Sequence, residues 1–216
     1  MEIHVLTPLF RVYLVPTLVY YLEPMDIQWY PIMTPSEITT FDKDWIHPVH
    51  VNELPPKAQC CQKFNAFLDL HEIIDDDYYA FMCDDNMYEP GFFDVIRQQS
   101  AKILICALYR GDATPNDNVV DKHPTNTLKA TKLSHIIPGR IDYAQFIIKG
   151  SLFKTHPFDP YVGCSDGRYI RNLAREYPHD VTFLPNLYAL FNYFQPGRYN
   201  KKERFPKPNW ELPKIL

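Results

Sequence analysis

Short apolar runs alternate with amphipathic segments along the first half of the chain. The runs have the length of strands, and the last of them is apolar at every position from Ile103 to Leu108, which is typical of a strand buried on both faces. The segments between them repeat apolar residues three and four positions apart, as helices that cover a sheet do. The predicted strands are 3–6, 27–33, 78–83 and 103–108, and the predicted helices are 15–23, 57–70 and 90–100.

This alternation predicts an α/β protein with a mostly parallel sheet flanked by helices, folded as a single domain. The second half continues with a strand at 141–149, a helix at 167–177 and a strand at 180–184. Residues 34–56 and 110–135 are expected to be long connections. In a sheet of this type ligands bind at the carboxyl ends of the strands, so the polar residues that follow the strands are the candidates for function.

Composition and charge narrow the class of protein. Of 216 residues, 46% are hydrophobic and 22% charged, which is an ordinary globular balance, and the net charge of −4 gives no reason to expect nucleic acid as a partner. No stretch of about 18 apolar residues is present, so no membrane span is expected. Because a strand-like run already starts at Ile3, no signal peptide is expected.

The five cysteines form neither a disulfide framework nor a zinc framework, because their number is odd and their spacing does not repeat. We therefore expect a soluble protein of a reducing compartment, the cytoplasm. The cysteines are Cys60, Cys61, Cys83, Cys106 and Cys164.

Two acidic segments flank the strand at 78–83. Asp84-Asp85-Asn86 follows the strand at its carboxyl end, where adjacent carboxylates suit Mg²⁺ or Mn²⁺ together with substrate phosphates. An acidic turn is the alternative interpretation, since Asp and Asn favour turns. Asp75-Asp76-Asp77 precedes the strand and so lies at the opposite, amino edge, where a solvated loop is the more common interpretation.

Residues 78–92, YYAFMCDDNMYEPGF, resemble the metal-binding segment of GT-A glycosyltransferases, especially those of the inverting family 2 type. In that family an apolar strand ends in a DxD-like acidic motif, and a proline then opens the next helix. Residues 7–11, TPLFR, resemble the family's first strand and the loop that contacts the nucleotide. Lys63 and Asn65 stand on the preceding helix where such enzymes often carry a basic residue and an Asn.

Two later segments extend the resemblance to about residue 190. Residues 141–149, with Asp142, are similar to the strand that lines the donor-sugar side of the site. Residues 163–171 are similar to the segment that places the catalytic base, here Asp166, at the start of a helix. No QxxRW sequence follows Asp166, which argues against a processive synthase. A bacterial or large-DNA-virus origin fits a compact transferase of this kind.

The resemblance implies a GT-A-like, Rossmann-like fold and a metal-assisted glycosyltransferase that uses Mn²⁺ or Mg²⁺. The donor would be a nucleotide-diphosphate sugar, with UDP favoured, and the acceptor a glycan or another hydroxyl compound. Asp85 and Asp84 would bind the metal, and Asp166 would act as general base in a direct displacement with inversion. The implied nucleotide-sugar contacts are Thr7, Pro8, Leu9, Arg11, Lys63, Asn65, Asp84, Asp85, Asn86 and Asp142.

The resemblance also divides the single domain of residues 1–216. Residues 1–108 would form the nucleotide-binding half, 109–195 the acceptor and catalytic half, and 196–216 a basic, proline-rich tail.

Several of these residues have a plain structural alternative. Asp166 would also serve as a helix N-cap, and Asn65 as a buried, hydrogen-bonded side chain. For Arg11 an exposed position on the surface is the favoured interpretation, and Asp142, taken as part of a strand, would contact a sugar hydroxyl or form a buried ion pair. In that family an acidic residue after the second strand often binds the nucleotide base of the donor. No such residue is evident at 33–36, so Asp42 or Asp44 is the expected substitute.

Two other functions remain open. The first is a non-catalytic module of the same fold that binds a nucleotide sugar or a glycan, in which Asp166 is only a cap. The second is a metal-dependent nucleotidyltransferase, ranked third because its phosphate loop needs glycine and residues 7–11 contain none.

Overall fold

The computed structural model describes residues 1–54, 59–109, 127–160 and 165–190. The strands are β1 (Ile3–Pro8), β2 (Gln28–Met33), β3 (Val49–His50), β4 (Tyr78–Phe81), β5 (Met87–Tyr88), β6 (Ile103–Tyr109), β7 (Thr127–Leu128), β8 (Phe146–Lys149) and β9 (Val181–Leu190). The α-helices are α1 (Val15–Leu22), α2 (Gln59–Leu70), α3 (Phe92–Arg97), α4 (Gly150–Phe153) and α5 (Ser165–Glu176).

One sheet of mostly parallel strands organises the chain. Its order is β3-β2-β1-β4-β8-β6-β9-β5, with β7 paired to β6. Strands β1 to β4 run parallel, β8 runs against both β4 and β6, and β9 runs parallel to β6. The short β5 and β7 are antiparallel to their neighbours. The structure therefore confirms an α/β domain with a mostly parallel sheet.

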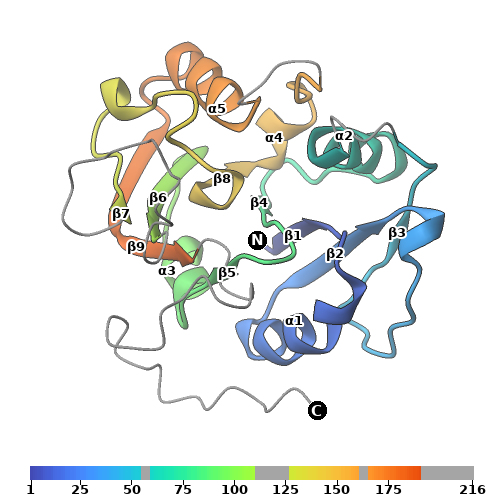
Figure 1. Cartoon of the computed structure of the whole chain (residues 1–216). Coiled ribbons are helices and arrows are strands. Elements are labelled where there is room, and N and C mark those ends of the chain that lie inside the picture. The colour runs from blue at the N-terminus through green and yellow to red at the C-terminus, as the bar shows by residue number, and fades with distance from the viewer. Residues whose placement is uncertain (55–58, 110–126, 161–164, 191–216) are drawn as a thin grey trace, which may run out of the picture.

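Helices cover both faces of this sheet (Figure 1). Helices α1 and α3 pack on one face, and α2, α4 and α5 pack on the other. The central strands are buried on both sides: in β4, Tyr78 and Ala80 join one apolar cluster while Tyr79 and Phe81 join the other. This double burial explains why these strands read as continuous apolar runs in the sequence.

The sequence-based boundaries differ from the structure in one place that matters for the site. The strand expected at 141–149 begins only at Phe146, so the prediction that Asp142 lies in a strand is wrong. Asp142 instead begins a short 3₁₀ turn, Tyr143–Gln145, and its side chain accepts a hydrogen bond from the Ala144 N–H at 3.0 Å. The Gln145 side chain in turn accepts from the Asp142 N–H at 3.0 Å, which completes a capping box.

The other differences concern element ends and short strands. The last strand, expected at 180–184, continues to Leu190, and β3, β5 and β7 were not anticipated. The helix expected from Gly167 begins at Ser165, so Asp166 lies in the first turn of α5. Residues 110–126 of the expected connection, and the tail from 196, lie outside the described residues. No helix in the described part of the chain is long and apolar enough to cross a membrane.

Gly150, where α4 begins, permits a close approach that any side chain would block. Its N–H donates to the carbonyl oxygen of Asp77 at 2.9 Å, and a Cβ atom at this position would overlap the backbone carbonyl of Ile74. We expect Gly150→Ala to lower the free energy of unfolding by about 1–3 kcal/mol, measured by chemical denaturation, because the loop before β4 must move. Ser151→Ala, one position further along α4, is the control and should change it by less than about 0.5 kcal/mol. Equal stability of the two variants would contradict the close approach.

Candidate active site

The loops that follow β1 and β4 meet at the carboxyl edge of the sheet, because these two strands are neighbours. The point of contact is the carboxylate of Asp84. Its Oδ2 accepts hydrogen bonds from the backbone N–H groups of Phe10 at 2.7 Å and Arg11 at 2.6 Å. Its Oδ1 bonds the Arg11 guanidinium, whose Nη2 also lies 3.3 Å from Oδ2 of Asp85. The residues predicted to bind phosphate and metal are thus brought together.

Burial and charge act against each other in this cluster. Asp84 is fully buried, and burial raises its pKa, while the two N–H groups and Arg11 oppose that shift. Burial lowers the pKa of Arg11, but Asp84 and Asp85 outweigh it, so that the pKa of Arg11 lies above its ordinary value. One guanidinium and two carboxylates leave the cluster with one net negative charge.

The side chains present fit a divalent ion through one carboxylate. Both oxygens of Asp84 are engaged by Arg11 and the two N–H groups, so a metal role for Asp84 requires Arg11 to move. The Asp85 carboxylate is 4% exposed and lies beside Arg11 at the same edge. Because Mg²⁺ commonly takes only one or two protein carboxylates and completes its shell with phosphate oxygens and water, Asp85 is a sufficient protein ligand.

Asn86 and Asp142 extend the cluster toward β8. The Asn86 amide donates to Oδ1 of Asp142 at 3.2 Å, and this oxygen also receives the Ala144 N–H. The 3₁₀ turn before β8 thereby fixes Asp142 beside the loop after β4. Asp142 thus lies beside the loop after β4, at the start of a turn, and its contact with a donor sugar stays a prediction.

The start of α5, which carries Asp166, is tied to the same region by a ring of three hydrogen bonds. Cys61 Sγ lies 2.8 Å from both Tyr143 Oη and Ser165 Oγ, and these two oxygens lie 2.6 Å apart. Burial raises the pKa of the Cys61 thiol and of the Tyr143 hydroxyl, which keeps both groups neutral. Asp166 is partly buried, and its Oδ1 accepts from the Gly167 N–H at 2.7 Å. Sequence reasoning missed this ring, because its members come from three separate segments.

Lys63 and Glu37 form a buried ion pair that holds the loop after β1 in place. Lys63 is fully buried; its Nζ donates to the Leu9 carbonyl at 2.7 Å and to Glu37 Oε2 at 2.5 Å, and it lies 4.1 Å from the centre of the Phe10 ring. Burial lowers the pKa of Lys63, and Glu37 opposes that shift. Lys63 thus contacts the loop after β1 at Leu9 and Phe10, and its direct contact with a donor stays a prediction.

An acidic residue, Glu37, follows the second strand just beyond the segment 33–36 that the sequence analysis considered. It closes a 3₁₀ turn, Pro35–Glu37, directly after β2, and its Oε2 accepts from the Thr34 N–H at 2.8 Å. The spacing Thr34-x-x-Glu37 is a capping box, a signal that was present in the sequence. The substitutes named from sequence, Asp42 and Asp44, are exposed on the following loop.

The remaining predicted contacts have structural partners of their own. The Asn65 amide forms two hydrogen bonds with the backbone of Phe158, at 2.8 and 2.9 Å, as in the hydrogen-bonded alternative, although the residue is only half-buried. The Thr7 hydroxyl accepts from Trp29 Nε1 at 2.9 Å, and Pro8 and Leu9 are buried. A nucleotide-sugar contact for these residues stays a prediction.

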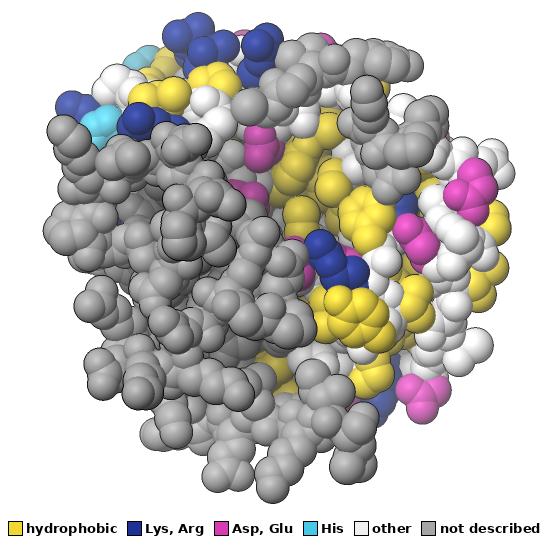
Figure 2. Space-filling view, viewed as in Figure 1, with side chains coloured by type: hydrophobic (Ala, Val, Ile, Leu, Met, Phe, Trp, Pro, Cys, Tyr) yellow, Lys and Arg dark blue, Asp and Glu magenta, His cyan; other side chains and the backbone are white. Residues whose placement is uncertain are grey.

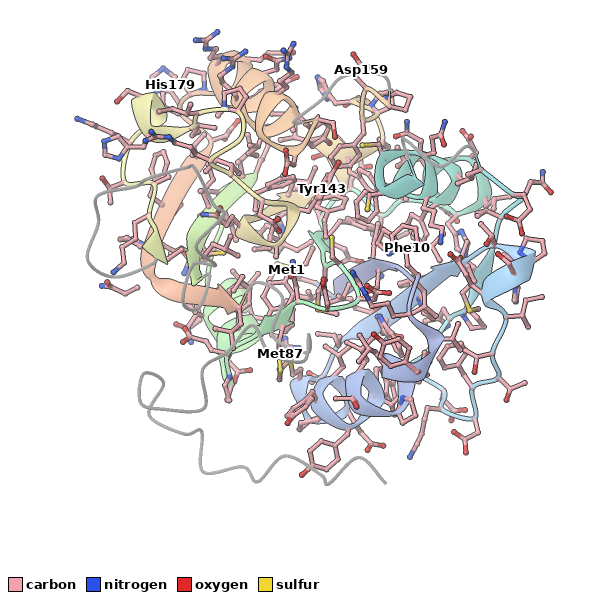
Figure 3. The ribbon with its side chains drawn as sticks, in the orientation of Figure 1. Met1, Phe10, Met87, Tyr143, Asp159 and His179 are labelled. Atoms are coloured by element: carbon pink, nitrogen blue, oxygen red, sulfur yellow. The ribbon has the colours of Figure 1, made fainter. Side chains whose placement is uncertain are left out.

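The face that carries these groups is hollowed. The space-filling view shows basic and acidic side chains beside apolar ones within the hollow (Figure 2). In the stick view Phe10 from the loop after β1, Met87 from β5 and Tyr143 from the turn before β8 lie around the middle of the same face (Figure 3). Asp159 and His179 lie near its rim.

Known structures share this arrangement of elements, whereas no family model and no curated protein matches the chain. TarS residues 1–349 from S. aureus align with a TM-score of 0.53 at 12% identity over 89% of this chain. Its complex with UDP-GlcNAc also gives 0.53. The chain spans only 58% of that protein's length. The inositol-1-phosphate CTP transferase of T. maritima aligns with a TM-score of 0.51 at 11% identity over 88% of both chains. At this level of identity the comparisons show the fold, which is GT-A-like.

The buried Lys63–Glu37 pair gives a direct test of how the loop after β1 is held. We expect Lys63→Met to lower the free energy of unfolding by about 3–5 kcal/mol, because it leaves a mostly buried carboxylate and the Leu9 carbonyl without their cation. The control is Lys43→Met, which breaks an exposed pair with Glu23 of 2.8 Å and should cost less than about 1 kcal/mol. Urea denaturation of both variants measures the difference, and similar losses would contradict this role of Lys63.

Proposed function

We propose that the protein is a metal-assisted glycosyltransferase that moves a sugar from a nucleotide-diphosphate donor, with UDP-sugars favoured, to a hydroxyl acceptor such as a glycan. The observation that carries this proposal is the joining of Arg11, Asp84 and Asp85 at the carboxyl edge of a GT-A-like sheet. The UDP-GlcNAc complex of TarS, a structure of similar fold, supports a nucleotide-sugar donor.

The leaving group dictates what this cluster has to do. When the bond between the anomeric carbon and the phosphate oxygen breaks, the diphosphate departs with the electron pair and gains negative charge. Arg11, whose side chain is 32% exposed, can turn its guanidinium toward that charge while Asp84 holds the loop through the Phe10 and Arg11 N–H groups. An Mn²⁺ or Mg²⁺ ion bound at Asp85 would supply further positive charge to the same oxygens.

The acceptor hydroxyl needs a base. In the proposed mechanism Asp166 takes the hydroxyl proton as the acceptor oxygen forms its bond to the anomeric carbon, which gives inversion in one step. The ring of Cys61, Tyr143 and Ser165 fixes the start of α5 and so limits the movement of Asp166. In the proposed mechanism Asp142, held by the buried Asn86, would bind sugar hydroxyls.

A nucleotidyltransferase is the second candidate, favoured by the alignment with the CTP transferase over 88% of both chains. In that reaction a substrate phosphate attacks the α-phosphorus of a nucleoside triphosphate, and pyrophosphate leaves. Such an enzyme would recognise CTP or another triphosphate in place of a nucleotide sugar. A non-catalytic binding module would recognise a nucleotide sugar or a glycan without turnover.

The identity of the ligand is tested by a thermal-shift screen of UDP-, GDP-, dTDP- and CMP-sugars and CTP, each with and without Mn²⁺. A ligand at 100 times its Kd stabilises the folded state by about 2.7 kcal/mol, a readily measured shift. We expect one nucleotide sugar to stabilise the protein more with Mn²⁺ than without it. Stabilisation by CTP and by none of the sugars would favour nucleotidyl transfer.

The roles of the two carboxylates are separated by Asp85→Asn and Asp166→Asn. We expect Asp166→Asn to lower turnover by about 10²–10⁴-fold, because the base is lost, while donor affinity stays within about twofold. Asp85→Asn should abolish turnover and the metal-dependent part of donor binding. Donor titration calorimetry and a product assay measure both effects.

Asp69→Asn, an exposed change on α2, is the matched control and should leave both readings unchanged. Equal donor affinity in the wild type and Asp85→Asn would contradict the metal role, and full turnover by Asp166→Asn would contradict the base.

A further inference from the structure

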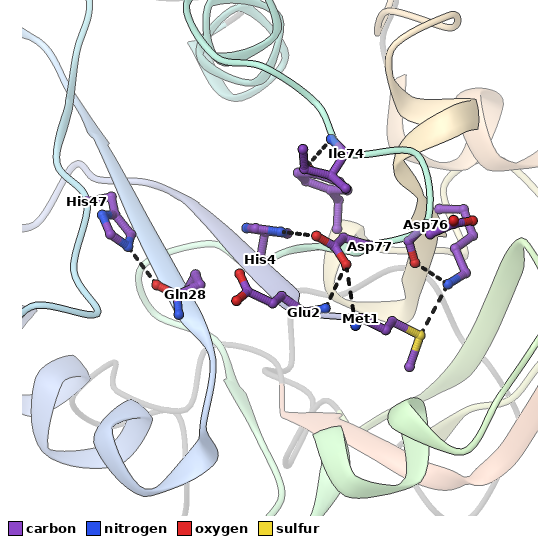
Figure 4. A network of polar contacts seen from close by, with 10 residues as sticks. Met1, Glu2, His4, Gln28, His47, Ile74, Asp76 and Asp77 are labelled. Atoms are coloured by element: carbon purple, nitrogen blue, oxygen red, sulfur yellow. Dashed lines mark hydrogen bonds and ion pairs between the residues drawn. The ribbon is translucent and has the colours of Figure 1, made fainter.

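The loop before β4 carries the acidic segment that the proposed function leaves unused. Asp75 and Asp76 are exposed on this loop, whereas Asp77 is only 8% exposed. Asp77 faces the start of β1, where Oδ1 accepts the Glu2 N–H at 2.7 Å and Oδ2 lies 3.2 Å from Nε2 of His4 (Figure 4). This cluster is at the amino edge of the sheet, at the opposite end of the strands from Asp84.

His4 is held in place as a coordinating group would be. It is 6% exposed, and its ring stacks on Tyr79 with centroids 4.7 Å apart and planes 15° apart. Its Nδ1 is buried and has no hydrogen-bond partner among the described residues. The only hydrogen-bonding contact found for the ring is therefore with Asp77, and its second nitrogen is unused, which calls for an explanation in a buried group.

The spacing of the polar atoms suits one metal ion. One nitrogen of His4 and one carboxylate oxygen each from Glu2 and Asp77 lie within 4.8 Å of one another. Nitrogen and oxygen ligands stand about 2.0–2.2 Å from Zn²⁺, so two ligands of one tetrahedral ion are about 3.3–3.6 Å apart. Glu2 is exposed and its side chain extends beneath the His4 ring in Figure 4, so a movement of its carboxylate by about 1–1.5 Å would close the site.

Charge at this edge also favours a cation. Glu2 and the three aspartates carry four negative charges, while Lys154 bonds the Asp75 carboxylate and Lys149 bonds the backbone oxygen of Asp76. The α-amino group of Met1 lies 4.0 Å from Asp77 Oδ1, at the outer limit of an ion pair. A divalent ion beside the His4 imidazole would stabilise the buried Asp77 carboxylate and the exposed Glu2 carboxylate together.

We propose that Glu2, His4 and Asp77 bind a divalent transition-metal ion, Zn²⁺ in the first place, at a site separate from the candidate active site. One imidazole nitrogen with two carboxylate oxygens is a ligand set for Zn²⁺, whereas Mg²⁺ prefers oxygen alone. Three protein ligands leave the fourth position to water on the exposed side of Glu2. By binding ligands from both segments, the ion links the start of β1 to the loop before β4.

The test is a calorimetric titration of Zn²⁺ into the full chain, carrying any affinity tag at its carboxyl end. We expect Glu2→Gln to weaken Zn²⁺ binding at least tenfold and Asp77→Asn to weaken it further. Asp76→Asn is the matched control, because it removes the same charge from the same loop, and its affinity should stay within twofold of the wild type. If Asp77→Asn does not fold, Glu2→Gln still tests the proposal, because Glu2 is exposed.

A nuclear magnetic resonance spectrum of the imidazole nitrogens gives a second readout, in which Zn²⁺ should shift the signal that His4→Gln removes. Asp85→Asn should still bind Zn²⁺ at this site. The outcome of this test therefore does not depend on the proposed transferase activity. Equal Zn²⁺ affinities of Glu2→Gln and Asp76→Asn, or an unshifted His4 signal at saturating Zn²⁺, would overturn the proposal.

Discussion

The carboxylate of Asp84 is the interaction on which the candidate site depends. It is fully buried, and two backbone N–H groups and a guanidinium from the loop after β1 converge on it. A buried carboxylate without such partners would cost several kcal/mol, so the two loops are held together by the need to satisfy it. Arg11 is thereby placed at the carboxyl edge, beside Asp85, before any ligand arrives.

The same constraint sets the electrostatics of the site. Arg11, Asp84 and Asp85 together carry one negative charge, and Asp142, joined to Asn86, adds another. A diphosphate approaching this edge would be repelled unless further positive charge came with it. Lys63 does not provide that charge directly, because its amino group is buried beneath the loop and bonded to Leu9 and Glu37. A divalent ion carried in by the diphosphate is the simplest source.

Much of the fold followed from the sequence, because the strands buried on both faces are unbroken apolar runs and the helices between them are amphipathic. The positions of Asp84, Asp85 and Asn86 followed as well, since polar residues after such strands must reach the carboxyl edge. The segment that begins with the capping box of Asp142 was predicted to be a strand, because apolar residues such as Tyr143 and Phe146 fit a buried strand and a buried turn equally well. The Cys61–Tyr143–Ser165 ring joins residues as far as 104 positions apart, and periodicity carries no information about such pairings.

Fold likeness at 11–12% identity does not distinguish the transfer of a sugar from the transfer of a nucleotide, because both reactions need a nucleotide at the carboxyl edge and positive charge beside its phosphates. The difference lies in the second substrate. A hydroxyl acceptor requires a base, whereas an attacking phosphate is already charged and is better met by cations. The start of α5 presents a partly buried carboxylate, Asp166, on a helix anchored by neutral groups. In the proposed mechanism this carboxylate would remove the proton of the acceptor hydroxyl, which is the reason to place glycosyl transfer first.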